Sequence, residues 1–392
     1  MLNKESLECE GIHYRLQVIF LFIASICVGT GIYEWIPLTN VLQQSFHVGQ
    51  EQIIFIGSVF SLFYAIGFLI FGWLANYVEI KKLLIVGTLL LMISTFLIGF
   101  ATNYKLMIVF RAIQGIFAAS FAPLGFSIIV KMFPESKRIA GISAITTGFV
   151  MAGILGQLYG SIIANSYSWS VVFWLQALIY LMIIISMIFL VPKTDKVSER
   201  PTSFIGELVK LLISKSLFPC YVITLTLLFC FVGMYTVMGM FFQKDFGLNN
   251  EKILWIRGIG IIGMIGSMVF AKLSKKIGVG NILSLGLVCA SIGVLIIGIS
   301  NNVGLSVAMS VVFVFGITIS LPMVVSSIGT LAGKKSGNAM TLYTFVLFIG
   351  ATVGPIVCNR IIESGSYPLA FIFLAVVLGI SFIASLIVRK TI

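Results

Sequence analysis

Long apolar segments separated by short polar connections dominate the pattern of this chain. An apolar window of about 20 residues is long enough to cross roughly 30 Å of hydrocarbon as a helix. Such windows recur at residues 16–38, 52–74, 83–101, 105–130, 139–163, 169–191, 217–241, 253–273, 281–299, 303–326, 338–359 and 368–388. The pattern therefore predicts an all-α polytopic membrane protein with twelve transmembrane helices.

One longer polar connection divides the chain near its middle. It covers residues 192–216 and is rich in Lys, Glu, Ser and Thr. We therefore expect an N-terminal six-helix bundle at 1–191, a cytoplasmic central loop at 192–216 and a C-terminal six-helix bundle at 217–392.

The two halves also resemble each other at an offset of about 198 residues. The matching pairs are Gly67 with Gly266, Gly72 with Ala271, Gly156 with Gly354, and Phe173 with Phe371. Matches at one long offset indicate a duplication in which both halves keep the same topology. The predicted fold is therefore two pseudo-symmetric bundles related by an axis along the membrane normal.

Composition supports the membrane class. Only 10% of the residues are charged and 59% are apolar, whereas soluble domains carry roughly 25% charged residues. The net charge of +12 is spread over short loops, and not over a soluble domain, so we expect no nucleic-acid partner. The expected partner is the lipid bilayer, and we expect the chain to act as a monomer.

The placement of Lys and Arg predicts the orientation. With a cytoplasmic N-terminus, nineteen of them fall in cytoplasmic segments, and the four outer ones are Lys105, Lys244, Lys252 and Arg360. This bias predicts cytoplasmic N- and C-termini in a cell (plasma or inner) membrane, and it requires an even number of spans. The frequent use of Lys and Ile is typical of an AT-rich bacterial genome.

Glu34 is the only acidic residue inside any predicted span. A carboxylate in hydrocarbon costs several kcal/mol unless it is paired, hydrated or protonated. We interpret Glu34 as a protonatable group of a transporter. The alternative is a polar group that satisfies a neighbouring helix or lies among the lipid headgroups.

Arg111 is the expected partner of Glu34. At 1.5 Å per residue, both positions lie roughly 10 Å below the outer surface, in the first and fourth spans. Opposite charges attract each other more strongly in such a low-dielectric site than in water. Arg111 has an alternative structural role, in which it donates to carbonyls of the first span. Gln114, one turn further on, is expected to bind substrate or the partner of Arg111.

This pair suits proton-coupled exchange. A carboxylate can give up and regain a proton, whereas the charge of an arginine cannot be discharged. If substrate and proton exclude each other at Glu34, the outcome is antiport. The chain has no Gly-Lys-Ser/Thr phosphate-binding loop, so we expect no cofactor and a proton gradient as the energy source.

Four motifs carry a resemblance to a known family. "RAIQGIFAA" at 111–119 is similar to the fourth-span motif of the major facilitator superfamily, and "GWLANYVEIKK" at 72–82 stands at its loop 2–3 motif. "GFVMAGILGQLYG" at 148–160 and "GTGIYEWIPLTNVLQQSFHV" at 29–48 resemble the arabinose-efflux-permease-like drug:proton antiporters. The resemblance implies a transporter that works by alternating access.

Several positions depart from those motifs. In loop 2–3, Asn76 stands where the family usually has Asp, and Glu79 where it has Gly. In the fifth span, Ala152 replaces a Gly and Gln157 replaces the usual Pro. The loop 2–3 motif of the family is therefore degraded in this chain.

Small residues are expected to form the moving surfaces. The fifth span carries them at every fourth position, in the series Ala144, Gly148, Ala152, Gly156 and Gly160, and the eleventh span has Gly350, Gly354 and Pro355. Such spacing lets two helix backbones approach closely. Because facilitator halves rock, we expect these residues, with Gly72 and Asn76, to act in gating. Plain tight packing is the alternative.

The substrate is expected to contact Tyr33, Gln157, Tyr235 and Tyr343, in addition to Glu34 and Gln114. A cavity with one acid, few polar groups and many aromatic rings suits lipophilic, often cationic, small molecules. Arg257, in the eighth span, has two possible roles. It attracts anionic or zwitterionic substrates if it faces the cavity, but snorkelling to the outer headgroups is the interpretation we favour.

The residues leave several functions open. The first is a proton-coupled exporter of amphipathic molecules, and the second is an importer or uniporter. An intramembrane enzyme would need a His/Asp, Asp/Asp or metal constellation, so we expect no enzyme and no metal. A transporter-like sensor would have little soluble chain through which to signal.

Overall fold

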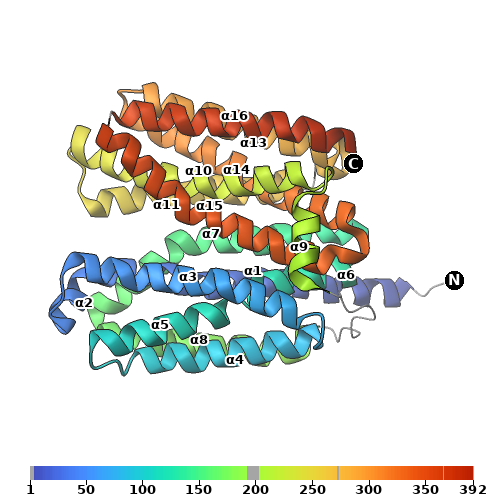
Figure 1. The fold of residues 1–392 in the computed structure, drawn as a ribbon, viewed down its shortest axis with the longest axis horizontal. Coiled ribbons are helices and arrows are strands. Elements are labelled where there is room, and N and C mark those ends of the chain that lie inside the picture. The colour runs from blue at the N-terminus through green and yellow to red at the C-terminus, as the bar shows by residue number, and fades with distance from the viewer. Residues whose placement is uncertain (1–3, 192–202, 272, 365, 392) are drawn as a thin grey trace. The chain divides into compact units, whose positions relative to one another are not determined.

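The computed structural model describes residues 4–191, 203–271, 273–364 and 366–391, and these residues are almost entirely helical (Figure 1). The helices of the first half are α1 (Lys4–Tyr33), α2 (Thr39–Phe46), α3 (Gln50–Leu74), α4 (Ile80–Ile98), α5 (Tyr104–Ala118), α6 (Phe121–Met132), α7 (Glu135–Ser166) and α8 (Trp169–Leu190). Those of the second half are α9 (Phe204–Leu212), α10 (Phe218–Asp245), α11 (Asn250–Ala271), α12 (Ser274–Ile277), α13 (Val279–Ile299), α14 (Val303–Ala332), α15 (Ser336–Ser364) and α16 (Tyr367–Thr391).

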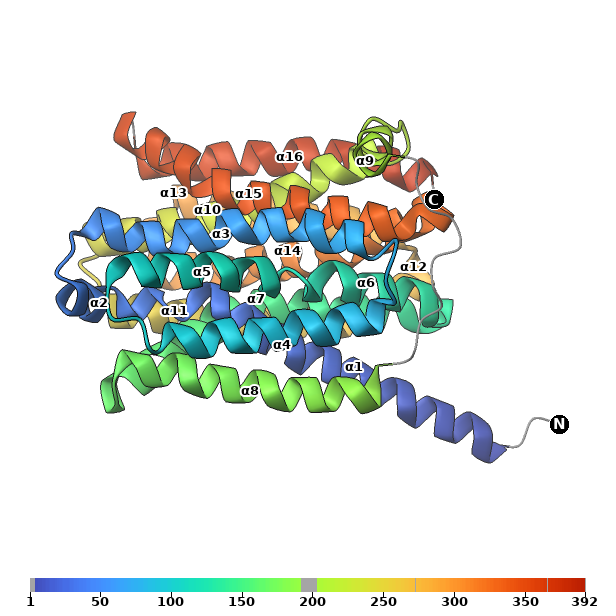
Figure 2. The same ribbon diagram turned by 60° about the horizontal axis from the view of Figure 1, so that its bottom comes forward.

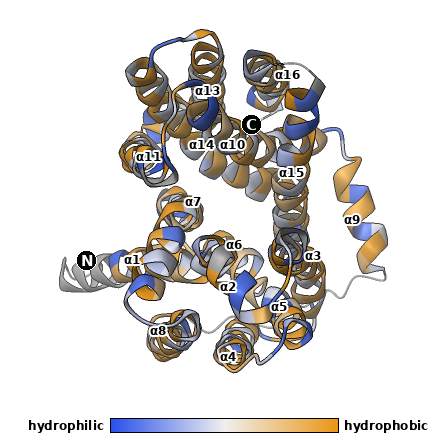
Figure 3. Cartoon of the chain, turned by 90° about the vertical axis from the view of Figure 1, so that its left-hand side faces the viewer, coloured by the Kyte–Doolittle hydropathy of each residue, from blue (hydrophilic) through white to orange (hydrophobic). Residues whose placement is uncertain are grey.

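The predicted twelve-span architecture is confirmed. Ten helical segments of the described chain are long and apolar enough to cross a membrane, and one of them, Val303–Glu363, contains both α14 and α15. The remaining span is α11, which has 22 residues although its apolar part, Trp255–Ser267, is shorter. Figure 3 shows the helices end-on, mainly in the hydrophobic colour.

The chain forms two compact units, residues 1–202 and 203–392. The boundary falls inside the predicted central loop, of which residues 192–202 lie outside the described chain. Helix neighbours repeat between the units: α1 packs on α7, α3 on α5 and α4 on α8, as α10 packs on α15, α11 on α14 and α13 on α16. The matched Phe173 and Phe371 are both fully buried. Each unit therefore repeats the same helix packing.

The predicted end of the first span at residue 38 agrees with the apolar segment Tyr14–Leu38, but the α-helix inside it ends earlier. Helix α1 ends at Tyr33, and a 3-10 turn, Ile36–Leu38, follows. Pro37 has no N–H with which to continue the α-helical bonding to the carbonyl of Tyr33. Glu34 therefore lies at the C-terminal end of α1, where the backbone turns, and not inside a continuous helix.

The fourth span is broken, whereas the apolar pattern predicted one helix at 105–130. Helix α5 ends at Ala118 and α6 begins at Phe121. Pro123 cannot donate to the carbonyl of Ala119, four residues earlier, and its ring crowds that carbonyl. The break leaves Arg111 and Gln114 on the short helix α5.

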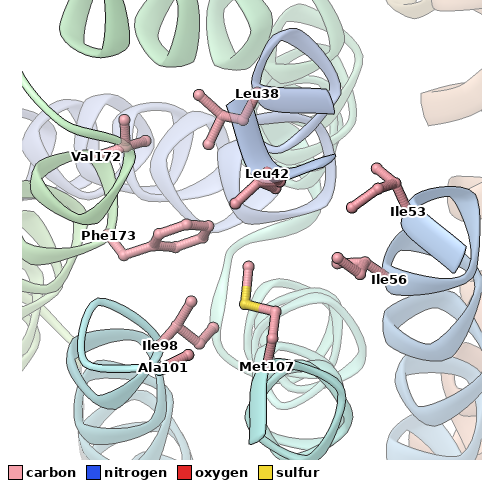
Figure 4. Close-up of a cluster of buried hydrophobic side chains, with 9 residues drawn as sticks. All are labelled: Leu38, Leu42, Ile53, Ile56, Ile98, Ala101, Met107, Val172 and Phe173. Carbon is pink, nitrogen blue, oxygen red and sulfur yellow. The ribbon is translucent and has the colours of Figure 1, made fainter. Parts of the chain in front are cut away.

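An apolar cluster fills one end of the first unit. Its nine buried residues come from the turn after α1, from the loop between α4 and α5, and from α2, α3, α4, α5 and α8 (Figure 4). They are Leu38, Leu42, Ile53, Ile56, Ile98, Ala101, Met107, Val172 and Phe173. Figure 2 shows α2 at the end of the unit opposite the N-terminus. Because Leu38 lies only four residues beyond Glu34, this cluster lies next to the acid along the chain.

Part of the segment predicted as central loop is the helix α9. Ser203 caps its first turn by accepting from the backbone N–H of Gly206. Glu207 fixes α9 to the start of α15, because its carboxylate accepts a 2.7 Å hydrogen bond from Asn338 and lies 3.3 Å from the ammonium of Lys335.

Glu207→Ala is expected to loosen α9. A hydrogen bond to a charged group contributes on the order of 1.5 kcal/mol, which corresponds to about tenfold faster amide exchange in α9. Hydrogen–deuterium exchange of the protein in lipid nanodiscs measures this rate. Lys335→Gln is the matched control and should change the rate little, because exposed ion pairs contribute little. Unchanged exchange in Glu207→Ala would contradict the anchoring role.

Candidate functional site

The centre of the candidate site is an ion pair buried in the first unit. The Oε1 atom of Glu34 lies 4.0 Å from the Nη1 atom of Arg111, and both side chains are fully shielded from solvent. The structure thus brings together the two residues that the sequence placed at the same depth. The distance exceeds that of a charge-assisted hydrogen bond, about 2.7–2.9 Å. The two charges attract each other without being locked together.

Arg111 is held mainly by other groups. Its Nη1 donates to the carbonyl of Gly31 at 3.0 Å and to Oε1 of Gln114 at 2.6 Å. Its Cζ lies 4.4 Å from the centre of the Phe60 ring, a cation–π geometry. Arg111 therefore does bond a carbonyl of the first span, as its structural alternative predicted, whereas its role in proton coupling stays a prediction. This contact also places a positive charge at the C-terminal, negative end of α1.

The charged pair keeps unused bonding capacity. Neither carboxylate oxygen of Glu34 has a hydrogen-bond partner among the described residues, and the same holds for Nε and Nη2 of Arg111. Buried polar groups are normally bonded, so these atoms are available to a proton or a ligand. No three His, Cys, Asp or Glu side chains of the described chain are grouped so that they could hold a metal ion.

Residues that were not predicted complete the surroundings of the pair. Gln114 donates to the hydroxyl of Thr95 on α4 at 2.9 Å, and Gln176 on α8 donates to the carbonyl of Cys27 on α1 at 2.7 Å. The hydroxyl of Tyr180, one turn from Gln176, is buried and lacks a hydrogen-bond partner among the described residues. Gln176 and Tyr180 stand one turn apart in a mainly apolar span, but this spacing alone did not place them beside Glu34.

Gly31 makes room for these groups beside Glu34. A methyl group at Gly31 would lie 3.0 Å from the Tyr180 hydroxyl, 3.7 Å from Nε2 of Gln114 and 4.0 Å from Oε1 of Glu34. All three polar side chains therefore border the bare face of this glycine. The sequence offered no reason to single out Gly31 from the other glycines of the chain.

The remaining predicted substrate residues are not all part of this cluster. Tyr33 is partly buried, next to Glu34, and its ring lies beside Gly153 on α7. Gln157 donates to the carbonyl of Gly153 in its own helix at 2.6 Å, so one of its two amide N–H donors is already used. Tyr235 and Tyr343 lie in the second unit, Tyr343 fully buried and Tyr235 partly buried.

The small-residue series of α7 packs against α1. A methyl group at Gly148 would lie 2.7 Å from the carbonyl oxygen of Phe22, and one at Gly156 would lie 3.1 Å from Cα of Thr30. At Gly160 it would overlap the carbonyl oxygen of Glu34 itself. The close approach predicted for this face is confirmed, whereas its role in gating stays a prediction.

The second unit repeats this packing. A methyl group at Gly350 would overlap the carbonyl oxygen of Leu225 on α10, and one at Gly354 would overlap that of Phe229. Pro355 lies inside α15, next to the contact, and is partly buried.

The loop 2–3 residues have local roles in the structure. Gly72 is buried near the end of α3, and Asn76 donates to the carbonyls of Gly72 at 3.0 Å and of Trp73 at 3.2 Å. Asn76 therefore caps the C-terminus of α3. Lys81 donates to the carbonyl of Ile188, at the end of α8, at 2.8 Å. The gating role predicted for Gly72 and Asn76 stays a prediction.

Arg257 does not snorkel, contrary to the interpretation we favoured. Its Nη2 donates to the carbonyl of Tyr235 on α10 at 3.2 Å, and its Cζ lies 5.9 Å from the centre of the Tyr235 ring. Gly239 provides the space, because a methyl group there would lie 2.9 Å from Nη2. The side chain is therefore directed toward α10 within its own unit.

Comparisons with known proteins agree with this architecture. The crystal structure of the human organic anion transporter MFSD10 (TETRAN) is similar to this chain with a TM-score of 0.80 and 14% sequence identity, over 95% of this chain and 99% of the human one. The model of the Major Facilitator Superfamily matches residues 21–355 and 260–391. Because that match covers most of the sequence, the chain belongs to the Major Facilitator Superfamily.

Proposed function

We propose that this protein is a proton-coupled antiporter that exports small amphipathic molecules by alternating access, with Glu34 as the proton-carrying group. The observation that carries the proposal is the loose pair of Glu34 and Arg111. An acid and a base that are both fully buried and 4.0 Å apart sit in a low-dielectric site, where their mutual attraction is strong.

Protonation of Glu34 would remove the negative charge that attracts Arg111. A neutral carboxyl no longer attracts Arg111, and the guanidinium can turn its unused Nε and Nη2 donors to another acceptor. Loss of the proton restores the pair. The site thus has two states that differ by one proton, which is what coupling of a conformational change to a proton gradient requires.

The position of Glu34 links this local change to the helices. Its backbone lies at the end of α1, in direct contact with Gly160 of α7, and Arg111 on α5 bonds the same end of α1 through Gly31. A change at the pair therefore acts on three helices at once. We further propose that both termini are cytoplasmic, because the segments on their side of the membrane carry most of the Lys and Arg residues. We also propose that the chain works as a monomer.

Everted membrane vesicles test the proposal. An inside-acid gradient is followed with an acridine pH probe, and a xanthene dye is then added, either rhodamine 6G, a cation, or sulforhodamine B, an anion. We expect one of the dyes to enter the vesicles containing wild-type protein and to dissipate part of the gradient. With Glu34→Gln, uptake and dissipation should fall to the level of vesicles without the protein.

Glu363→Gln is the matched control, because it removes an exposed carboxylate near the end of α15 and should leave transport unchanged. Gradient-driven transport that is equal in wild type and Glu34→Gln would contradict the role of this residue. Dye movement that strengthens the gradient, in place of dissipating it, would favour the importer that the sequence left open.

A further inference from the structure

The second unit contains a cation in its helical core without a matching acid. Arg257 lies on α11, seven residues after its start. Ion pairs among the described side chains join Lys82 with Glu79, Arg111 with Glu34, and Lys335 with Glu207, and none includes Arg257. The nearest acids along α10 and α15, Asp245 and Glu363, are exposed at helix ends.

The bonds that Arg257 does make are weak for a guanidinium. It has one hydrogen bond of 3.2 Å to a neutral carbonyl and a distant approach to an aromatic ring. Its Nε atom is shielded from solvent and has no hydrogen-bond partner in the described chain. A buried charge normally has an ionic or strong hydrogen-bonding partner, so the site is electrostatically incomplete.

A second unused donor lies beside it. The hydroxyl of Tyr235 is also buried without a hydrogen-bond partner among the described residues. Gly260, one turn from Arg257 on α11, makes room for it, since a methyl group there would lie 2.5 Å from that hydroxyl. Gly239 makes room for the guanidinium in the same way. Two glycines thus open the α10–α11 contact around a guanidinium and a phenol.

We infer that Arg257 and Tyr235 form the binding site for the anionic group of an organic substrate, such as a carboxylate, sulfonate or phosphate. A guanidinium offers several N–H donors in a planar fork that matches these groups, and a phenol adds one O–H donor. The Nε atom of Arg257 is shielded, whereas its side chain as a whole is only partly buried, so part of the guanidinium side chain remains at the surface of its unit. An anion placed there supplies the missing negative charge.

The substrate is thus assigned a negative charge. Calling the bound anion a substrate rests on the proposed transport function. An anionic substrate replaces the cationic one that the aromatic composition suggested. Export of an anion in exchange for a proton moves positive charge inward in both halves of the cycle. An inside-negative membrane potential would therefore drive the exchange in addition to the pH gradient.

The test is equilibrium binding of sulforhodamine B and rhodamine 6G, measured by fluorescence anisotropy with purified protein in nanodiscs of phosphatidylcholine. We expect the wild type to bind the anionic dye more tightly than the cationic one. Arg257→Gln should bind sulforhodamine B at least about tenfold more weakly, the loss of one charge-assisted contact. Arg257→Lys should fall between them, because it keeps the charge but loses the planar fork.

Lys252→Gln is the control, since it removes an exposed cation from the same helix and should not change binding. Tyr235→Phe, a conservative variant that keeps the ring, should weaken sulforhodamine B binding by a smaller factor. If Arg257→Gln runs as an aggregate in size-exclusion chromatography, Arg257→Lys and Tyr235→Phe carry the test. Equal affinity for the anion in all folded variants, or no anion binding by the wild type, overturns the inference.

A lipid headgroup offers the same phosphate chemistry and is distinguished in a second arm. Nanodiscs that contain phosphatidylglycerol should leave sulforhodamine B affinity unchanged if the site serves a substrate. A several-fold loss of affinity in those discs would assign the site to an anionic lipid and overturn the substrate assignment. Binding of the dye does not depend on proton coupling. If the protein binds the anion through Arg257 but shows no gradient-driven transport, only the proposed antiport is contradicted.

Discussion

Arg111→Ala is expected to be the most destabilising single substitution at the candidate site. It leaves Glu34 fully buried with no cation, and it also removes the contacts of Arg111 with Gly31 and Gln114. Removing one partner of a buried ion pair costs on the order of 3–5 kcal/mol. Thermal unfolding of the purified protein in detergent should show a clear fall in melting temperature at neutral pH.

The double variant Glu34→Gln/Arg111→Gln is the control for this prediction. It removes both charges together, so it should recover much of the stability lost in Arg111→Ala. If Arg111→Ala and the double variant unfold at the same temperature, the cost does not come from an uncompensated charge. A melting temperature equal to that of the wild type in Arg111→Ala would contradict the buried pair itself.

Gly160→Ala is expected to damage both packing and transport. The added methyl group would overlap the carbonyl oxygen of Glu34, so α1 and α7 must separate where the acid is held. Overpacking of this kind costs about 1–3 kcal/mol. We expect a lower melting temperature and a loss of gradient-driven dye uptake in vesicles.

Gly153→Ala on the same helix is the matched control. A methyl group at Gly153 would lie 3.7 Å from the ring of Tyr33, an ordinary van der Waals distance. Because alanine favours helix over glycine by roughly 0.5–1 kcal/mol, this variant should be as stable as the wild type or more so. Equal behaviour of the two variants would show that the close approach at Gly160 does not matter.

Most of the fold could be predicted from the sequence, because the physical signals are strong and local. A long apolar run indicates each span, and the duplication of the halves predicts the same helix neighbours in both. Hydrophobicity predicted the helix ends wrongly where a single proline interrupts a long apolar run. Pro37 ends α1 before the apolar segment ends, and Pro123 divides the fourth span. Hydrophobicity does not predict such breaks, because they depend on backbone hydrogen bonding.

The pair of Glu34 and Arg111 could also be predicted, since charges are rare within spans and their depth follows from helix rise. The pair is not duplicated: at the offset of 198 residues the second half has Val232 and Met309. The partners of the pair on other helices could not be foreseen. Whether Tyr180 lies near Glu34 depends on the rotation of α8 about its axis, which side-chain packing sets.

The interpretation of Arg257 was wrong for the same reason, because the packing of neighbouring helices could not be foreseen from the sequence. Its distance from the span end suggested snorkelling, because a long side chain can reach the headgroups from one or two turns inside. The outcome was decided by Gly239 on a neighbouring helix, which leaves a space for the guanidinium. A pattern along one helix does not reveal a space on another.

Counting the protons released when substrate binds tests whether Glu34 carries the coupled proton. Antiport through Glu34 requires substrate and proton to weaken each other's binding, and this linkage is reciprocal. Purified protein in a weakly buffered solution is mixed with the dye that it binds, and a pH electrode follows the change. We expect proton release by the wild type and by Glu363→Gln, and none by Glu34→Gln. Equal proton release by Glu34→Gln, or no release by the wild type on binding, would contradict the claim that Glu34 carries the coupled proton.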